Sequence, residues 1–61
     1  MYYQEFGPWR NAYGYKMTMA TIDDLYVLKT RTPYGVKRIT YHWSEASVEQ
    51  QIDLYNQDRI Y

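Results

Sequence analysis

The fold is decided by the stretch LYVLKTRTPYGVKRITYHW, residues 25–43, in which two alternating runs flank a Pro-Tyr-Gly loop at residues 33–35. A three-residue loop that begins with proline and ends with glycine is typical of a β-hairpin, with Gly35 in the left-handed conformation. The register can be fixed by placing Thr32 opposite Val36. One face of the predicted hairpin then collects the apolar side chains that form the expected core, namely Leu25, Val27, Ile39, Tyr41 and Trp43.

The predicted hairpin is basic. Its register sets Arg31 opposite Lys37, a like-charge pair that costs stability. Basic side chains beside an aromatic ring suit phosphate contact and base stacking, and they equally suit an acidic protein. The alternative is a solvated tip whose lysines protect a sheet edge. The candidate partner-binding residues of this surface are Lys29, Arg31, Tyr34, Lys37 and Arg38.

A further strand precedes the hairpin. Residues 13–20 alternate, with two tyrosines and two methionines on one side, which predicts a half-buried strand. It joins the same core if Met19 pairs with Leu25 and Met17 with Val27, through a loop at residues 20–24. Within this loop the Asp-Asp pair at residues 23–24 favours turn formation over metal binding, because adjacent side chains rarely converge on one ion.

The hydrophobic period changes after Trp43. Ser44 and Ser47 are both candidate N-caps, and Val48, Ile52 and Tyr55 form an apolar stripe at helical spacing. We expect an amphipathic helix over residues 44–58 that packs on one face of the sheet. The predicted fold class is therefore α+β, a three-stranded antiparallel β-meander at residues 12–43 with one C-terminal helix.

Two further surfaces are candidate partner contacts. The predicted helix carries an outward acidic stripe, which could imitate the regular negative charge of nucleic acid or be an ordinary solvated face. Residues 1–11 are predicted to form an aromatic N-terminal arm that bends at Gly-Pro. Its rings could anchor in a partner, contact a second copy, or cover one edge of the core. The residues concerned are Glu45, Glu49 and Asp53 on the helix, and Phe6 and Trp9 on the arm.

Length and composition narrow the functional classes. The 61 residues predict a single domain, residues 1–61, with no cysteine and one histidine. This composition excludes disulfides and argues against a zinc site, so we expect no metal and no cofactor. No signal-peptide pattern or long apolar run is present, which favours a soluble cytoplasmic protein with no membrane partner.

Catalytic chemistry is not indicated. The serines fall at helix-cap positions, and no phosphate-binding glycine loop is present. His42 is the single imidazole, and it is expected on the sheet face away from the helix, near Tyr26. We therefore expect a protein that is not an enzyme.

The aromatic content indicates macromolecular contact. Nine tyrosines, two tryptophans and one phenylalanine in 61 residues exceed what so small a core can bury. Tyrosine and tryptophan are enriched at interface hot spots. The sequence thus predicts a protein-binding module, an inhibitor or modulator of a host macromolecular machine that acts by occupying a surface. In type it is similar to bacteriophage accessory proteins, and its compartment would then be the host cytoplasm. The alternative is a small nucleic-acid-binding domain that uses the basic hairpin.

Overall fold

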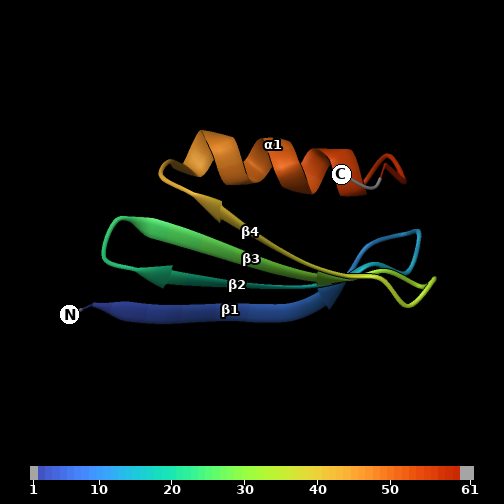
Figure 1. Ribbon diagram of the computed structural model, residues 1–61, viewed down its shortest axis with the longest axis horizontal. Helices are drawn as coiled ribbons and strands as arrows, with labels where there is room; N and C mark the ends of the chain where they lie inside the picture. The colour runs from blue at the N-terminus through green and yellow to red at the C-terminus, as the bar shows by residue number, and fades with distance from the viewer. Residues whose placement is uncertain (1, 60–61) are drawn as a thin grey trace.

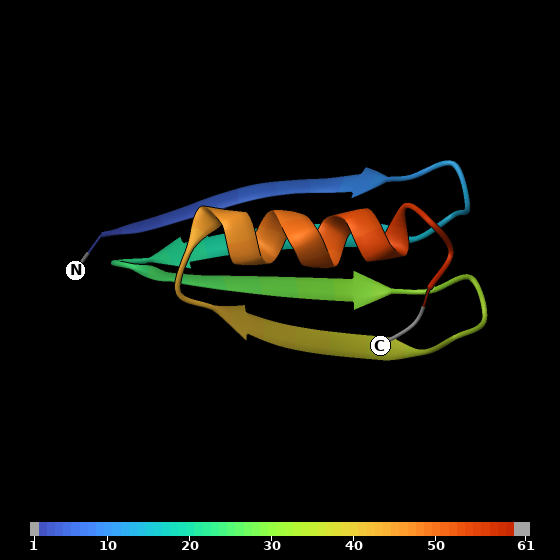
Figure 2. The ribbon, with the colours of Figure 1, turned by 90° about the horizontal axis from the view of Figure 1, so that it is seen from above.

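The computed structural model describes residues 2–59 of the chain. Its elements are β1 (Tyr3–Arg10), β2 (Lys16–Ile22), β3 (Leu25–Arg31), β4 (Lys37–His42) and α1 (Glu45–Tyr55). The strands form one antiparallel sheet in the order β1-β2-β3-β4. Figure 1 shows α1 lying along one face of this sheet, and Figure 2 shows the same helix from above. The α+β architecture is confirmed, but the sheet has four strands where three were predicted.

The additional strand is β1, formed by a segment that was predicted to be an arm at residues 1–11. Its residues Tyr3–Arg10 pair with β2 along one edge of the sheet. The register shifts between Phe6 and Trp9, where Gly7 adopts a φ of 98° and a proline follows. Proline is tolerated at an irregularity on an edge strand, because no ladder hydrogen bond is lost there. This shift interrupts the alternation of side chains by which a strand is predicted from sequence.

The pairing of β2 with β3 differs from the predicted one. Met19 pairs with Leu28, whereas it was predicted to lie opposite Leu25. The connection is a two-residue turn at Asp23 and Asp24, in which Asp23 adopts a φ of 53°. Aspartate is one of the few residues that tolerate this left-handed conformation, so the tight turn is accessible to this sequence. The observed register differs from the predicted one by three residues. Because this number is odd, the methionines of β2 lie on the same side of the sheet as the other set of β3 side chains.

The pairing of β3 with β4 was predicted correctly. Val27 lies opposite Tyr41, and Arg31 lies opposite Lys37. Gly35 adopts a φ of 86° in the connecting loop, as the Pro-Tyr-Gly loop requires.

The face that α1 covers is the opposite of the predicted one. The helix packs over the face that carries Leu28 and His42, not the face of Val27. Of the five predicted core residues, Val27 is buried and Leu25 is half-buried. The other three are exposed: Ile39 by 54%, Tyr41 by 64% and Trp43 by 75%. The core cluster is instead formed by Tyr15, Met17, Leu28, Val48 and Tyr55.

The apolar stripe of the helix is confirmed. Val48 and Tyr55 are buried, and the half-buried Ile52 packs against the same core. Ser44 is the N-cap, since its hydroxyl oxygen accepts a hydrogen bond from the backbone N–H of Ser47 at 3.2 Å. This bond satisfies one of the amide donors that a helix N-terminus leaves without an intrahelical partner.

The helix ends at Tyr55, before the predicted end at residue 58. The following turn brings Asp58 into the left-handed region, with a φ of 59°. Its carboxylate accepts a hydrogen bond of 2.7 Å from the hydroxyl of Tyr15, which ties this turn to the sheet. Burial, together with this hydrogen bond, raises the pKa of Tyr15 to about 12. Within residues 2–59, no helix has the length and apolar character needed to cross a membrane.

Asn11 joins the β1–β2 loop to the end of the helix. Its side-chain Oδ1 accepts hydrogen bonds from the backbone N–H groups of Tyr13 and Tyr15, at 2.9 and 3.0 Å. Its Nδ2 donates to the carbonyl of Tyr55 at 2.9 Å and to Oδ1 of Asn56 at 3.1 Å. One amide side chain therefore shapes the loop and satisfies a carbonyl at the helix C-terminus.

We predict that Asn11→Ala lowers stability by about 2–3 kcal/mol, because several hydrogen bonds worth about 1 kcal/mol each are lost together. For a domain of this size that loss corresponds to a fall in Tm of roughly 10–20 °C, measurable by circular dichroism. Asn11→Asp is the matched variant, since it keeps the acceptor oxygen and removes the donor. An unchanged Tm in both variants would contradict the role given to this side chain.

Candidate functional site

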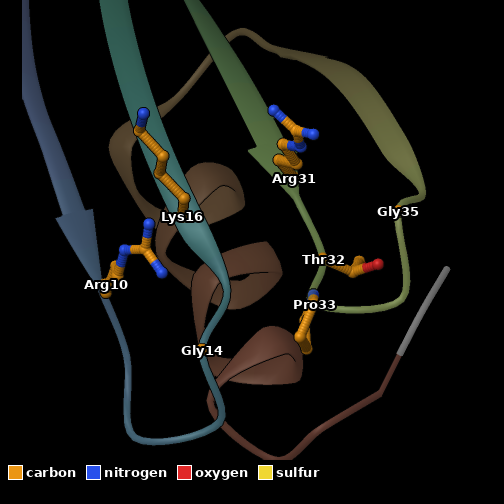
Figure 3. A pocket seen from close by; sticks show the side chains of 7 residues that line it. All are labelled: Arg10, Gly14, Lys16, Arg31, Thr32, Pro33 and Gly35. Carbon is orange, nitrogen blue, oxygen red and sulfur yellow. The ribbon is translucent and has the colours of Figure 1, made fainter.

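The sheet face turned away from α1, called here the uncovered face, carries a row of basic side chains. Arg10 pairs with Lys16, Lys16 with Arg31, and Arg31 with Lys37. Directly paired residues project to the same face, so these four form a continuous line across all four strands, called here the cation row. Figure 3 shows the side chains of Arg10, Lys16 and Arg31 on the same side of the sheet, with the helix behind it.

The cation row has no evident folding role. Neighbouring strands lie about 4.8 Å apart, and like charges directly opposite one another are destabilising. Among the strand residues that the structure describes, Glu5 is the one acidic residue on the uncovered face. It pairs with Ala20, four residues along β2 from Lys16 and thus about 14 Å from the row. Its carboxylate also accepts a hydrogen bond from the hydroxyl of Tyr3 at 2.6 Å. The row is therefore a concentrated positive charge presented to solvent.

The other end of the uncovered face is mainly apolar and aromatic, and Glu5 lies at its β1 edge. Ile39, Tyr41 and Tyr3 lie on this face by strand alternation, and Tyr3 is 57% exposed. Trp43, which directly follows β4, is the most exposed large apolar side chain of the described residues, at 75%. These exposed rings make this end of the uncovered face a candidate contact surface.

The structure separates the predicted hairpin surface into two faces. Lys29, Arg31 and Lys37 lie on the uncovered face, while Arg38 pairs with Thr30 and projects to the helix side of β4. Tyr34 stands in the hairpin loop and is 66% exposed.

The other predicted contact residues lie elsewhere. Phe6 and Trp9 are on the helix side of β1, where Trp9 packs against the core and Phe6 remains 39% exposed. The predicted arm thus contributes one ring to the core. The acidic side chains of α1 are all exposed and lie on the opposite side of the sheet from the cation row, namely Glu45, Glu49 and Asp53.

His42 lies on the helix side of the sheet, which corrects the predicted placement away from it. It pairs with Tyr26, as expected, and is 9% exposed. Its Nδ1 lies 2.9 Å from the hydroxyl oxygen of Ser47 and its Nε2 lies 2.8 Å from that of Thr40. Burial lowers the pKa of His42 below its usual 6.5, because the charged imidazolium is poorly solvated there. The residue joins β4 to the first turn of the helix.

This lowered pKa predicts a pH-dependent stability. The unfolded chain takes up the histidine proton more readily than the folded one, so stability is full above about pH 6.5 and falls as pH drops below it. We expect the urea midpoint to be lower at about pH 5.5 than at about pH 7.5, a window above most carboxylate titration. The variant His42→Gln should lose this difference. An equal shift in the variant would assign the effect to another group.

The described residues contain no candidate metal site. No group of three or more histidine and acidic side chains is placed to hold an ion within residues 2–59. At the β2–β3 turn, Asp23 Oδ1 accepts a hydrogen bond from the backbone N–H of Tyr2 at 2.9 Å.

Arg10 and Lys16 were not predicted from the sequence as members of the basic surface. Both were separated from the hairpin along the chain, and only the four-stranded register places them beside Arg31. The signal that could have identified them is the Asp-Asp turn, because a two-residue connection between β2 and β3 sets Lys16 opposite Arg31.

No protein-family model, no curated protein and no solved structure matches this chain.

Proposed function

We propose that this protein is a non-enzymatic binding module that takes single-stranded nucleic acid on its uncovered face. The observation that carries the proposal is the cation row, four basic residues in direct register across four strands. Cross-strand repulsion of this kind lowers stability, and a polyanionic partner relieves it. Phosphate contacts with lysine and arginine supply most of the affinity of sequence-independent nucleic-acid binding.

The distribution of charge also supports an oriented approach. The net charge of the chain is zero, yet five of the seven basic residues lie on the uncovered face, since Lys29 joins the four of the cation row. The acidic residues of α1 lie on the other side of the sheet. A polyanion would be attracted by the basic sheet face and repelled by the acidic helix face. The electric field of the protein would therefore orient the two molecules before they make contact.

The aromatic end of the face favours a single strand over a duplex. Sheet-based RNA-binding modules stack two or three bases on rings of an open four-stranded sheet, and each stacked base is worth about 1–3 kcal/mol. Bases can stack on Tyr41 and Trp43 only when they are not paired inside a duplex. The ring-bearing residue Tyr41 lies about 14 Å from the cation row, because it is four residues along β4 from Lys37, and Trp43 follows the end of the strand.

The protein partner predicted from the sequence is the competing hypothesis. Exposed tyrosines and tryptophans serve protein interfaces as well. An apolar contact would need the aromatic end of the uncovered face and would gain little from the cation row, whereas a nucleic-acid strand uses both ends. Salt dependence therefore separates a nucleic-acid strand from a protein partner that is bound by apolar contact.

The test is a titration of labelled oligonucleotides of about eight nucleotides, single-stranded and duplex, followed by fluorescence anisotropy. We expect tighter binding of the single strand, with a slope of log K against log salt near −3 for the four contacts of the cation row. Binding of neither form at about 50 mM salt would reject the proposal. Capture of a protein whose affinity is insensitive to salt would support the competing hypothesis.

A further inference from the structure

The loop end of the uncovered face contains a hollow of about 410 Å³. It lies where the β1–β2 loop meets the β3–β4 loop, and the two loops are close enough that a Cβ on Gly14 would stand 3.6 Å from Pro33. Figure 3 shows how its lining side chains lie. The lining residues are Arg10, Gly14, Lys16, Arg31, Thr32, Pro33 and Gly35.

The chemistry of this hollow is that of an anion site. Three of the seven lining residues are basic and none is acidic. Arg10, Lys16 and Arg31 come from three neighbouring strands and project to one side. Guanidinium groups match the oxygen geometry of phosphate with paired donors, and a lysine adds a compact point charge.

The backbone around the hollow is held in place. The hydroxyl oxygen of Thr32 accepts hydrogen bonds from the backbone N–H groups of Tyr34 and Val36, at 3.3 and 3.1 Å. Asn11 fixes the opposite loop through the N–H groups of Tyr13 and Tyr15. Both walls are therefore set by hydrogen bonds within the fold, and a ligand would not have to order them.

The charge and size favour a phosphomonoester. A phosphodiester carries one negative charge, whereas a terminal phosphate carries about −1.5 to −2 at neutral pH. Three cations gathered around one hollow are better matched by the doubly charged group. The volume falls in the range of small-molecule pockets, which leaves room for an attached sugar.

We propose that this hollow binds a phosphomonoester, and that its source is the terminal phosphate of a nucleic-acid strand lying on the uncovered face. The strand part of this inference rests on the proposed function, while the phosphate chemistry does not. From the hollow, a strand would follow the sheet toward Tyr41, about 14 Å from the cation row along β4. That span corresponds to about four stacked nucleotides at 3.4 Å each.

The experiment compares oligonucleotides of one sequence that carry a 5′-phosphate, a 3′-phosphate or hydroxyls at both ends. We expect one of the phosphorylated forms to bind about tenfold more tightly than the hydroxyl form, the effect of one additional charge-assisted contact. The double variant Arg10→Gln, Lys16→Gln should remove this preference. Lys29→Gln is the matched control, because Lys29 lies on the same face outside the hollow and should weaken all three forms equally.

A second arm titrates the protein with inorganic phosphate and follows the amide resonances of Gly14 and Gly35. Saturable shifts that disappear in the double variant support the site even if no oligonucleotide binds, which would identify free phosphate compounds as the source. Oligonucleotide binding without preference for a terminal phosphate, and without a response to inorganic phosphate, would overturn this inference and leave the proposed function standing.

Discussion

Replacing Tyr55 by alanine is expected to unfold the protein. Tyr55 has no exposed surface, and its ring lies 5.6 Å from that of Tyr15 at the centre of the core. Removing a buried aromatic ring typically costs 3–5 kcal/mol. A core in a domain of this size rarely supplies more than about 3–5 kcal/mol in total, so the variant should show no cooperative thermal transition.

Two matched variants make this prediction specific to the face that α1 covers. The buried hydroxyl of Tyr55 has no hydrogen-bond partner, so Tyr55→Phe removes an unsatisfied group and should leave stability equal or higher. Trp43 is 75% exposed, so Trp43→Ala should change stability by only about 0.5 kcal/mol. A folded Tyr55→Ala with an unfolded Trp43→Ala would show that the helix covers the other face.

Neutralising three of the four residues of the cation row is expected to weaken nucleic-acid binding roughly 100-fold at about 0.1 M salt, because each single-strand phosphate contact contributes about fivefold there. The variant is Lys16→Gln, Arg31→Gln, Lys37→Gln. The same change should stabilise the fold by about 1 kcal/mol, since like charges in direct register repel one another. Affinity by anisotropy and stability by urea denaturation would thus move in opposite directions.

The chain offers a close control for this variant. Arg38 is the neighbour of Lys37 in β4 and carries the same charge, but it projects to the helix side of the sheet. We expect Arg38→Gln to weaken binding far less than Lys37→Gln. Equal losses would mean that net charge alone governs affinity, and that the uncovered face has no special role.

The sequence predicted the elements more reliably than their faces. The hairpin register followed from its loop, and the helix followed from the spacing of Val48, Ile52 and Tyr55. The face of the hairpin could not be chosen in the same way, because β3 carries apolar side chains on both of its sides. Leu25 and Val27 alternate with Tyr26 and Leu28, so either set could have met the helix.

The wrong face followed from the pairing between β2 and β3. Once Met19 was placed opposite Leu25, the methionines joined the wrong side of β3. The observed partner of Met19 is Leu28, and this pairing requires a tight turn in which Asp23 adopts a positive φ. The local sequence is compatible with several turn lengths and does not select this one.

The candidate site was predictable only in part for the same reason. The pair of Arg31 and Lys37 followed from the hairpin, and the structure confirms that these residues lie opposite each other. The extension of that pair by Arg10 and Lys16 required contacts between segments far apart in the chain. Such long-range pairing is set by the packing of the whole sheet and not by local preference.

The most direct test of the proposed surface is the set of intermolecular nuclear Overhauser contacts between the protein and a bound single-stranded oligonucleotide. We predict contacts from base protons to the rings of Tyr41 and Trp43, with phosphates near the cation row. Contacts to the exposed side of α1 in their place, around Glu49 and Asp53, would contradict it.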